Sequence, residues 1–195
     1  MKIKKAFFIL LTISMINLCA EELDELYNNY MLSGGKVTTE LNELIKNDEY
    51  YQNAVAEIKN PKVEKKEAKD PESMRLMQVD IKKIDWNRVY ENLLKSNDTY
   101  QNPISAYYGV YIINKYMGQV NKLDEYKKFS ETLYKKEKNM CQSFINYGAI
   151  FEKGLGSPIN VFKAIEVYEE GLKFTCKDGW QKQVIESKLL ALKRK

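Results

Sequence analysis

Residues 143–172 read SFINYGAIFEKGLGSPINVFKAIEVYEEGL, and this stretch determines the fold that we expect. Apolar or small residues recur in both halves at spacings of four, three and four, at Phe144, Gly148, Phe151 and Leu155 and then at Val161, Ile165, Tyr168 and Leu172. Such spacings place each set on one face of a helix. In an antiparallel helical hairpin, residues equally far from the turn meet, so Gly148 is predicted to face the Tyr168 ring, where a side chain would clash.

The turn between these two helices carries its own signals. Gly154 and Gly156 let the backbone reverse tightly, and Asn160 is in position to cap the second helix. The residues therefore predict an α–α hairpin.

The residues that define this hairpin also form a family pattern. They are Tyr147-Gly148, Phe151, Gly154-Leu155-Gly156, Asn160, Lys163-Ala164 and Val167-Tyr168. The pattern resembles a Sel1-like repeat, a helix-pair relative of the tetratricopeptide repeat. Ser157, Val167 and Gly171-Leu172 depart from it, at positions where the family has a valine, a tryptophan and a pair of small residues. The resemblance covers about 30 of the 195 residues, and Gly148, Gly154, Gly156, Asn160, Ala164 and Tyr168 are its repeat-motif residues.

An internal echo favours a second unit of the same kind. Tyr108-Gly109 recurs 39 residues later as Tyr147-Gly148, and periods of about 20–50 residues are typical of solenoids. Residues 104–138 would form this earlier, degenerate pair. Caps are expected for the other helices at Thr38 or Thr39, Asp85, Asn102-Pro103 and Asn121. The expected fold is therefore all-α, a short α–α repeat solenoid.

The chain divides at a charged segment. Residues 62–72 hold four positive and four negative charges, two apolar residues and a proline, which is typical of a solvated linker or a loose helix. We therefore expect a signal peptide at 1–20, an N-terminal helical segment at 21–59, a linker at 60–73 and a helical-repeat domain at 74–195. The linker would let the N-terminal helices dock apart from that domain.

The N-terminus is typical of an export signal. Lys2, Lys4 and Lys5 precede an apolar run at 6–16, which is too short to span a bilayer comfortably. Cleavage after Ala20 would give a soluble periplasmic protein. The alternatives are secretion, a lipid anchor on Cys19 or an uncleaved signal. Only a lipid on Cys19 or an uncleaved signal would place the protein on a membrane.

Composition excludes several classes of function. The chain contains no histidine, which removes the Ser/His/Asp triad and the usual zinc ligand sets. The formal net charge is +4, and loss of the three signal-peptide lysines leaves +1, so nucleic-acid binding is not expected. Glu166, Glu169 and Glu170 are interpreted as a solvated helix face, and we expect no catalytic, cofactor or metal residues.

Cys141 and Cys176 remain after the signal is removed, and an even pair in an exported protein is a candidate disulfide. They lie one turn beyond the last packed pair of the hairpin, so a bridge between them is geometrically plausible. The alternative is two unpaired small residues. The resemblance points the same way, because related secreted Sel1-like proteins staple helix pairs with disulfides.

The resemblance also implies a function. Sel1-like and tetratricopeptide-like stacks act as scaffolds or adaptors, which here implies a non-enzymatic module that binds other envelope proteins, for example in secretion or motility machinery. Tyr107 and Tyr111 are the candidate partner-binding residues. The alternative is binding or hydrolysis of β-lactam or peptidoglycan-type ligands, but Ser130, Ser143 and Ser157 have no lysine three residues on. An assay with nitrocefin distinguishes the two.

Overall fold

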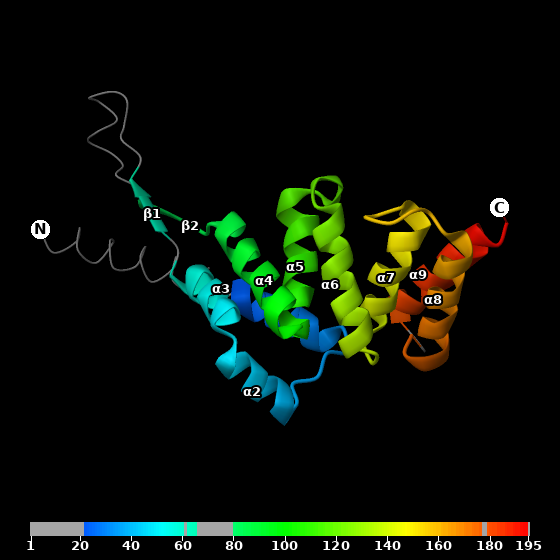
Figure 1. Ribbon diagram of the computed structural model, residues 1–195, viewed down its shortest axis with the longest axis horizontal. Coiled ribbons are helices and arrows are strands. Elements are labelled where there is room, and N and C mark those ends of the chain that lie inside the picture. The colour runs from blue at the N-terminus through cyan, green and yellow to red at the C-terminus, as the bar shows by residue number, and fades with distance from the viewer. Residues whose placement is uncertain (1–21, 61, 66–79, 177–178, 195) are drawn as a thin grey trace, which may run out of the picture.

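The computed structural model describes residues 22–60, 62–65, 80–176 and 179–194, and the predicted signal peptide lies outside them. Apart from one pair of short strands this part of the chain is helical, which confirms the all-α prediction. After an N-terminal helix at residues 22–32, the α-helices are α2 (Thr39–Asn47), α3 (Glu49–Lys59), α4 (Trp86–Tyr100), α5 (Pro103–Ile112), α6 (Leu123–Lys136), α7 (Cys141–Lys153), α8 (Val161–Phe174) and α9 (Gly179–Leu192) (Figure 1). Within the described ranges, no helix has both the length and the apolar character needed to cross a bilayer.

The helices pack largely in the order of the sequence. From α3 to α9, each helix contacts the one that follows it, and there are further contacts between α4 and α6 and between α7 and α9. Figure 1 shows α4 to α8 as a row across the molecule. Buried apolar side chains form one core that extends from the N-terminal helix through α3 to α6 to one side of α7, and a second around α7 to α9. From α3 to α9, each helix therefore packs mainly against its neighbours in the sequence.

The sequence had suggested that the N-terminal segment docks apart from the rest of the protein, but it does not. Leu26 and Tyr30 of the N-terminal helix are fully buried, and Tyr51, Ala54 and Ile58 of α3 are also buried. All five belong to the same core as the buried residues of α4 to α6. The expectation of separate docking was wrong because period and charge show which face of a helix is apolar, but not which distant helix covers it. Residues 61 and 66–73 of the predicted linker lie outside the described residues.

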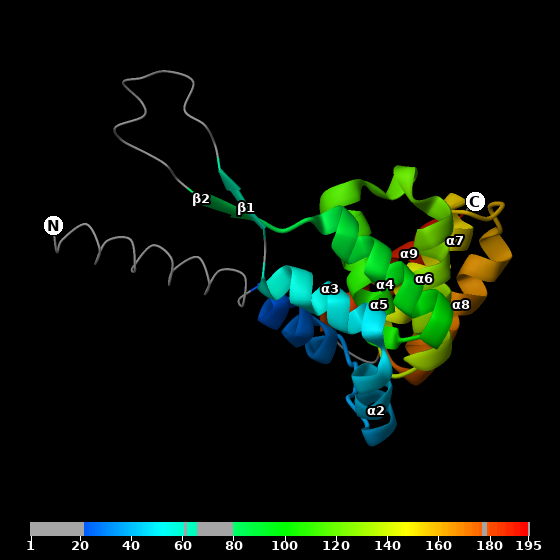
Figure 2. The same cartoon turned by 60° about the vertical axis from the view of Figure 1, so that its left-hand side comes forward.

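Part of the charged segment is extended instead of being a loose helix. Strand β1 (Lys62–Lys65) pairs antiparallel with β2 (Asp80–Lys83), with Lys62 opposite Lys83 and Lys65 opposite Asp80. Strand pairing satisfies backbone groups and needs no apolar alternation, so the two strands have no clear signal in the sequence. Figure 2 shows this hairpin standing away from the helices.

Most of the predicted caps are present. Thr38, Asp85 and Asn102 each accept a backbone N–H from the first turn of α2, α4 and α5, respectively. Asn121 does not cap α6, because its amide donates back to the Met117 carbonyl at 3.1 Å and α6 starts without a side-chain cap. Helix α5 ends at Ile112 and continues as the π-helix η2 (Ile113–Met117), followed by the 3-10 helix η3 (Gln119–Asn121).

The α7–α8 pair forms the hairpin described by the sequence pattern. A Cβ atom on Gly148 would lie 2.2 Å from Cε1 of Tyr168, a fully buried ring. Gly154 and Gly156 adopt positive φ angles in the turn, and the Asn160 side chain accepts the Lys163 N–H at 3.0 Å. Ala164 is fully buried on the inner face of α8. The close approach of the two helices thus depends on a missing side chain.

A matching contact occurs in the preceding pair. A Cβ atom on Gly109 of α5 would lie 2.5 Å from the buried ring of Phe129 on α6. In both pairs the ring comes 20 residues after the glycine, and the two contacts are 39 residues apart. The Tyr-Gly echo in the sequence therefore corresponds to equivalent positions in space.

The predicted disulfide is confirmed. Cys141 at the start of α7 is bonded to Cys176 after α8, with Cα atoms 5.1 Å apart, and both residues are buried. The bond joins the open end of the hairpin, opposite the glycine turn. A loop of this length corresponds to a stabilisation of about 3–4 kcal/mol in the chain-entropy description.

Candidate functional site

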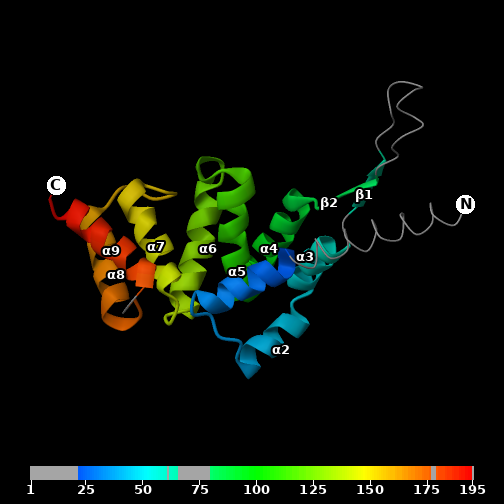
Figure 3. The same ribbon diagram turned by 180° about the vertical axis from the view of Figure 1, so that it is seen from behind.

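The predicted partner-binding residues lie beneath the N-terminal helix. Tyr107 and Tyr111 are one turn apart on α5, and both are partly buried. Since α5 packs against α4 and α6 on its other sides, these two rings occupy its remaining face. Figure 3 shows the N-terminal helix (blue) crossing α5 on that face. We call Tyr107, Tyr111, Lys115 and Tyr116 the α5 surface.

The N-terminal helix is anchored by buried groups. The Tyr30 ring meets that of Tyr107 edge-on, with centroids 5.5 Å apart, and the hydroxyls of Tyr107 and Ser33 are 3.2 Å apart. Tyr30 also donates to Oε1 of Glu137 at 2.5 Å. Burial raises the pKa of both Tyr30 and Glu137. Together with Leu26, Tyr30 gives this helix two fully buried side chains, an arrangement typical of a helix bound in a groove.

A cation lies at the other end of the same face. Lys115 of η2 donates to the Tyr111 hydroxyl at 2.7 Å and to Glu22 of the N-terminal helix at 3.0 Å. The hydrogen bonds with Tyr111 and Tyr116 raise the pKa of Lys115, which keeps the ammonium charged. Tyr116 donates to the same carboxylate and stacks on Trp86, with centroids 4.3 Å apart. The α5 surface therefore combines aromatic rings with one positive charge.

The pairing of charges on this surface is specific. Glu25 lies 3.4 Å from the Tyr111 hydroxyl, one turn along from Glu22. Carboxylates on one side of the bound helix thus face hydroxyl and ammonium donors on α5 and η2. The turn of π-helix supplies Lys115 and Tyr116, and π-helical turns are frequent at functional sites. The surface is suited to an amphipathic helix with acidic residues on its polar edge.

Lys115, Trp86 and Glu22 were missed in the sequence analysis. The available signal was the acidic run at residues 21–25, which has no local cation to neutralise it. Tyr108, next in sequence to Tyr107, is in the core, where its ring lies 6.2 Å from that of Tyr51.

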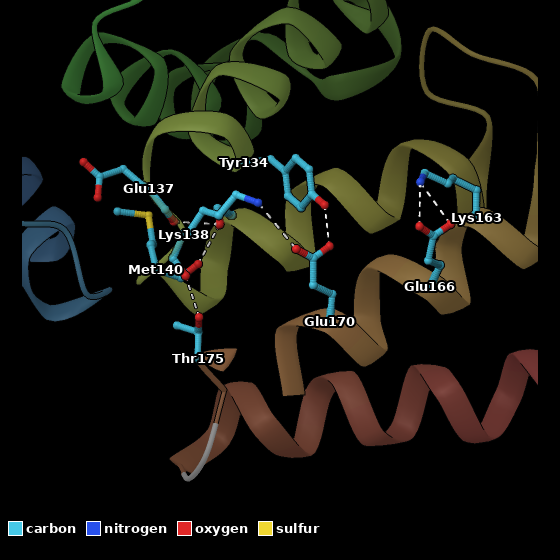
Figure 4. A network of polar contacts seen from close by, with 9 residues as sticks. Tyr134, Glu137, Lys138, Met140, Lys163, Glu166, Glu170 and Thr175 are labelled. Atoms are coloured by element: carbon cyan, nitrogen blue, oxygen red, sulfur yellow. Dashed lines mark hydrogen bonds and ion pairs between the residues drawn. The ribbon is translucent and has the colours of Figure 1, made fainter. Parts of the chain in front are cut away.

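The acidic residues of α8 form no metal or acid–base cluster. Figure 4 shows Glu166 paired with Lys163, at 3.0 Å, and Glu170 accepting from the Tyr134 hydroxyl. Glu169 pairs with Lys193 at 2.6 Å. Each carboxylate thus has its own partner. In the described part of the chain, no group of three or more Cys, Asp or Glu side chains could hold a metal ion.

Two of the serines considered for nucleophilic chemistry lie in the protein interior. Ser130 and Ser143 are fully buried, and the Ser143 hydroxyl bonds the backbone carbonyls of Glu137 and Met140. Lys188, which follows a serine in the sequence, donates to Glu152 at 2.6 Å. In these contacts, neither Ser130 nor Ser143 has a lysine beside it that could act as a base.

No protein-family model matches the chain, and searches of curated proteins and of solved structures found no match.

Proposed function

We propose that this protein is a non-enzymatic helical-repeat scaffold, exported to the periplasm, that binds other proteins of the cell envelope. The proposal includes the Sel1-like character of the repeat, which rests on the motif at 143–172. It is supported by the sequential packing of α3 to α9 and by the equivalent contacts at Gly109 and Gly148. Such stacks present extended surfaces to partners.

The observation that carries this proposal is the helix held on the α5 surface. A short acidic helix there buries Leu26 and Tyr30 completely and meets Lys115 through Glu22. Helix-in-groove recognition uses the same ingredients, namely a few apolar anchors and a polar edge. We therefore propose that the α5 surface and the N-terminal helix together form the partner-binding region, in an adaptor of an envelope complex such as secretion or motility machinery.

The test uses the disulfide-bonded protein from residue 21 onward as bait for envelope extract, with cross-linking and mass spectrometry. Point variants are preferable to deletion of residues 21–73, because that deletion would remove buried core residues such as Tyr30 and Ile58. Tyr111→Ala and Lys115→Ala are expected to reduce the captured partners at least fivefold.

Two controls match these variants in residue type. Phe162→Ala removes an aromatic ring that is 88% exposed on α8, and Lys136→Ala removes an exposed lysine on α6. Both are expected to leave capture unchanged. If no envelope protein cross-links specifically, the scaffold proposal is wrong. If partners are captured equally by all four variants, the α5 surface is not the binding region.

A further inference from the structure

A polar surface groove runs along the contact between α3 and α4, on a part of the molecule outside the α5 surface. It has a volume of about 520 Å³ and is lined mainly by Asn53, Glu57 and Asn60 from the α3 side and by Arg88, Asn92 and Lys95 from α4. Ligand pockets commonly have volumes of about 300–1,000 Å³. The groove is thus large enough to hold a segment of a partner.

The two helices run antiparallel beside this groove. Glu57 near the end of α3 lies 3.4 Å from Arg88 at the start of α4, whereas Asp48 before α3 bonds Ser96 near the end of α4. In that register, Asn53 is one turn before Glu57 and lies opposite Asn92, one turn after Arg88. The register therefore places Asn53 and Asn92 across the groove from each other near its middle, and both residues line it.

The charges of the groove cancel. Arg88 and Lys95 are balanced by Glu57 and by Glu91, which also lines it, so a highly charged ligand gains little. No aromatic side chain lines the groove. It therefore lacks both the positive charge and the stacking face that bind single-stranded nucleic acid.

What the groove does offer is amide chemistry. A carboxamide has N–H donors and an oxygen acceptor, which match the C=O and N–H of a peptide bond. Asn92 uses one N–H on the Arg88 carbonyl at 3.1 Å, which fixes its amide and leaves the other N–H and the oxygen for a ligand. From Arg88 to Lys95 the helix rises about 10 Å, the length of about three extended residues.

Glu57 adds an unpaired acceptor. Its side chain is 11% exposed, its Oε2 faces Arg88, and its Oε1 is buried with no hydrogen-bond donor among the described residues. A buried acceptor without a donor costs free energy. Because Oε1 is covered, a main-chain N–H beside Arg88 would reach it only after the Glu57 side chain turns toward the groove.

We propose that the α3–α4 groove binds an extended peptide segment of a partner through its main chain, with Asn53 and Asn92 as the central contacts. This inference rests on the proposed function, because it assumes that the ligand is a protein. The groove reads backbone amides, so it accepts varied side chains, while Arg88 and Lys95 favour an acidic residue near either end.

The test begins by panning a phage-displayed library of random 12-residue peptides on the disulfide-bonded protein. Enriched peptides are synthesised with a fluorophore and measured by anisotropy. Asn53→Ala and Asn92→Ala are each expected to weaken binding about tenfold, the equivalent of about one good hydrogen bond. Asn42→Ala, an exposed asparagine on α2 outside the groove, is expected to have no effect.

A second measurement leaves the protein unchanged. N-methylation of the central peptide amides should abolish binding to the wild-type protein, whereas changes of the central side chains should alter it less than threefold. Failure to enrich any peptide, or binding that is indifferent to Asn53, Asn92 and N-methylation, would overturn the groove proposal. A protein that still cross-links envelope partners in the capture experiment would then keep its scaffold function without this groove.

Discussion

The α5–α6 and α7–α8 pairs are built around the same contact but are secured in different ways. In each, a helical glycine lies directly under an aromatic ring 20 residues later, Phe129 for Gly109 and Tyr168 for Gly148. The α7–α8 pair is closed by a short glycine turn and by a disulfide. The α5–α6 pair is joined instead through η2 and η3 and has no covalent bond across it.

The support for α5 comes from distant parts of the sequence. Asp48 lies 54 residues before Asn102 and accepts its amide at 2.8 Å, next to a 2.5 Å bond from Ser96. The N-terminal helix covers the Tyr107 ring. A helix pair that is closed by its own turn and disulfide can thus be recognised from a local sequence motif. A pair that is held by segments far away in the sequence cannot.

Loss of the disulfide should have the largest effect and should fall on one pair only. Replacing Cys141 and Cys176 by serine is expected to lower the free energy of unfolding by about 3–4 kcal/mol. Urea unfolding measures this change. Hydrogen exchange should accelerate in α7 and α8 but not in α4 and α5; acceleration spread evenly over all four helices would contradict the separation of the two pairs.

Asp48 should matter for the other pair. Asp48→Ala removes the cap of α3 and leaves the buried groups of Ser96 and Asn102 without their acceptor, so we expect a loss of about 2–3 kcal/mol in urea unfolding. Asp85→Ala, which removes only the exposed cap of α4, should cost about 1 kcal/mol. Equal losses would show that the buried network contributes nothing beyond capping.

The N-terminal helix should respond to a single hydroxyl. Tyr30→Phe removes the hydrogen bond to Glu137 and should lower stability by about 1 kcal/mol. In the variant, the increase in amide hydrogen exchange over wild type should be larger in residues 22–32 than in α8. If exchange in residues 22–32 is unchanged, the buried bond does not hold this helix on α5.

Glu152 gives the α7–α8 pair a dependence on pH. Burial alone would raise its pKa, but hydrogen bonds from Lys188 and Tyr168 outweigh burial and lower the pKa below the ordinary 4.5. The ionised carboxylate therefore contributes stability that is present above about pH 4.5 and is lost as the pH falls through the folded-state pKa.

Glu152→Gln should accordingly cost about 1 kcal/mol at pH 7 and progressively less toward pH 3. Unfolding curves at several pH values measure the difference. Glu186→Gln, at an exposed pair with Lys182, should show no such trend. A Glu152→Gln penalty that is constant with pH would mean that the carboxylate is not held ionised by its partners.

The sequence predicted the parts whose partners are local. The hairpin at 143–172, its cap at Asn160 and the disulfide followed from spacing, because helices joined by a short turn must pair in register. The position of the N-terminal helix did not follow, since Tyr30 bonds Glu137, which lies 107 residues away. The spacing of apolar residues shows which face of a helix is buried, but not which other helix covers that face. The strands were not predicted, because backbone pairing between strands requires no apolar alternation in the sequence.

The candidate site was predicted only in part, for the same reason. Tyr107 and Tyr111 stood out as helical aromatics, but the contacts of Lys115 depend on the π-helical turn and on Glu22 from the far end of the chain. The α3–α4 groove depends on how Asn53 faces Asn92, which requires the register of two helices separated by a hairpin.

The equivalence of the two helix pairs can be measured by two double-mutant cycles in urea unfolding. One combines Gly109→Ala with Phe129→Leu, and the other combines Gly148→Ala with Tyr168→Leu. Each alanine should clash with the ring and be better tolerated beside leucine, so that both couplings have the same sign and agree within about 1 kcal/mol. Coupling at Gly148 alone, with Gly109→Ala tolerated in the wild-type protein, would contradict a repeated unit.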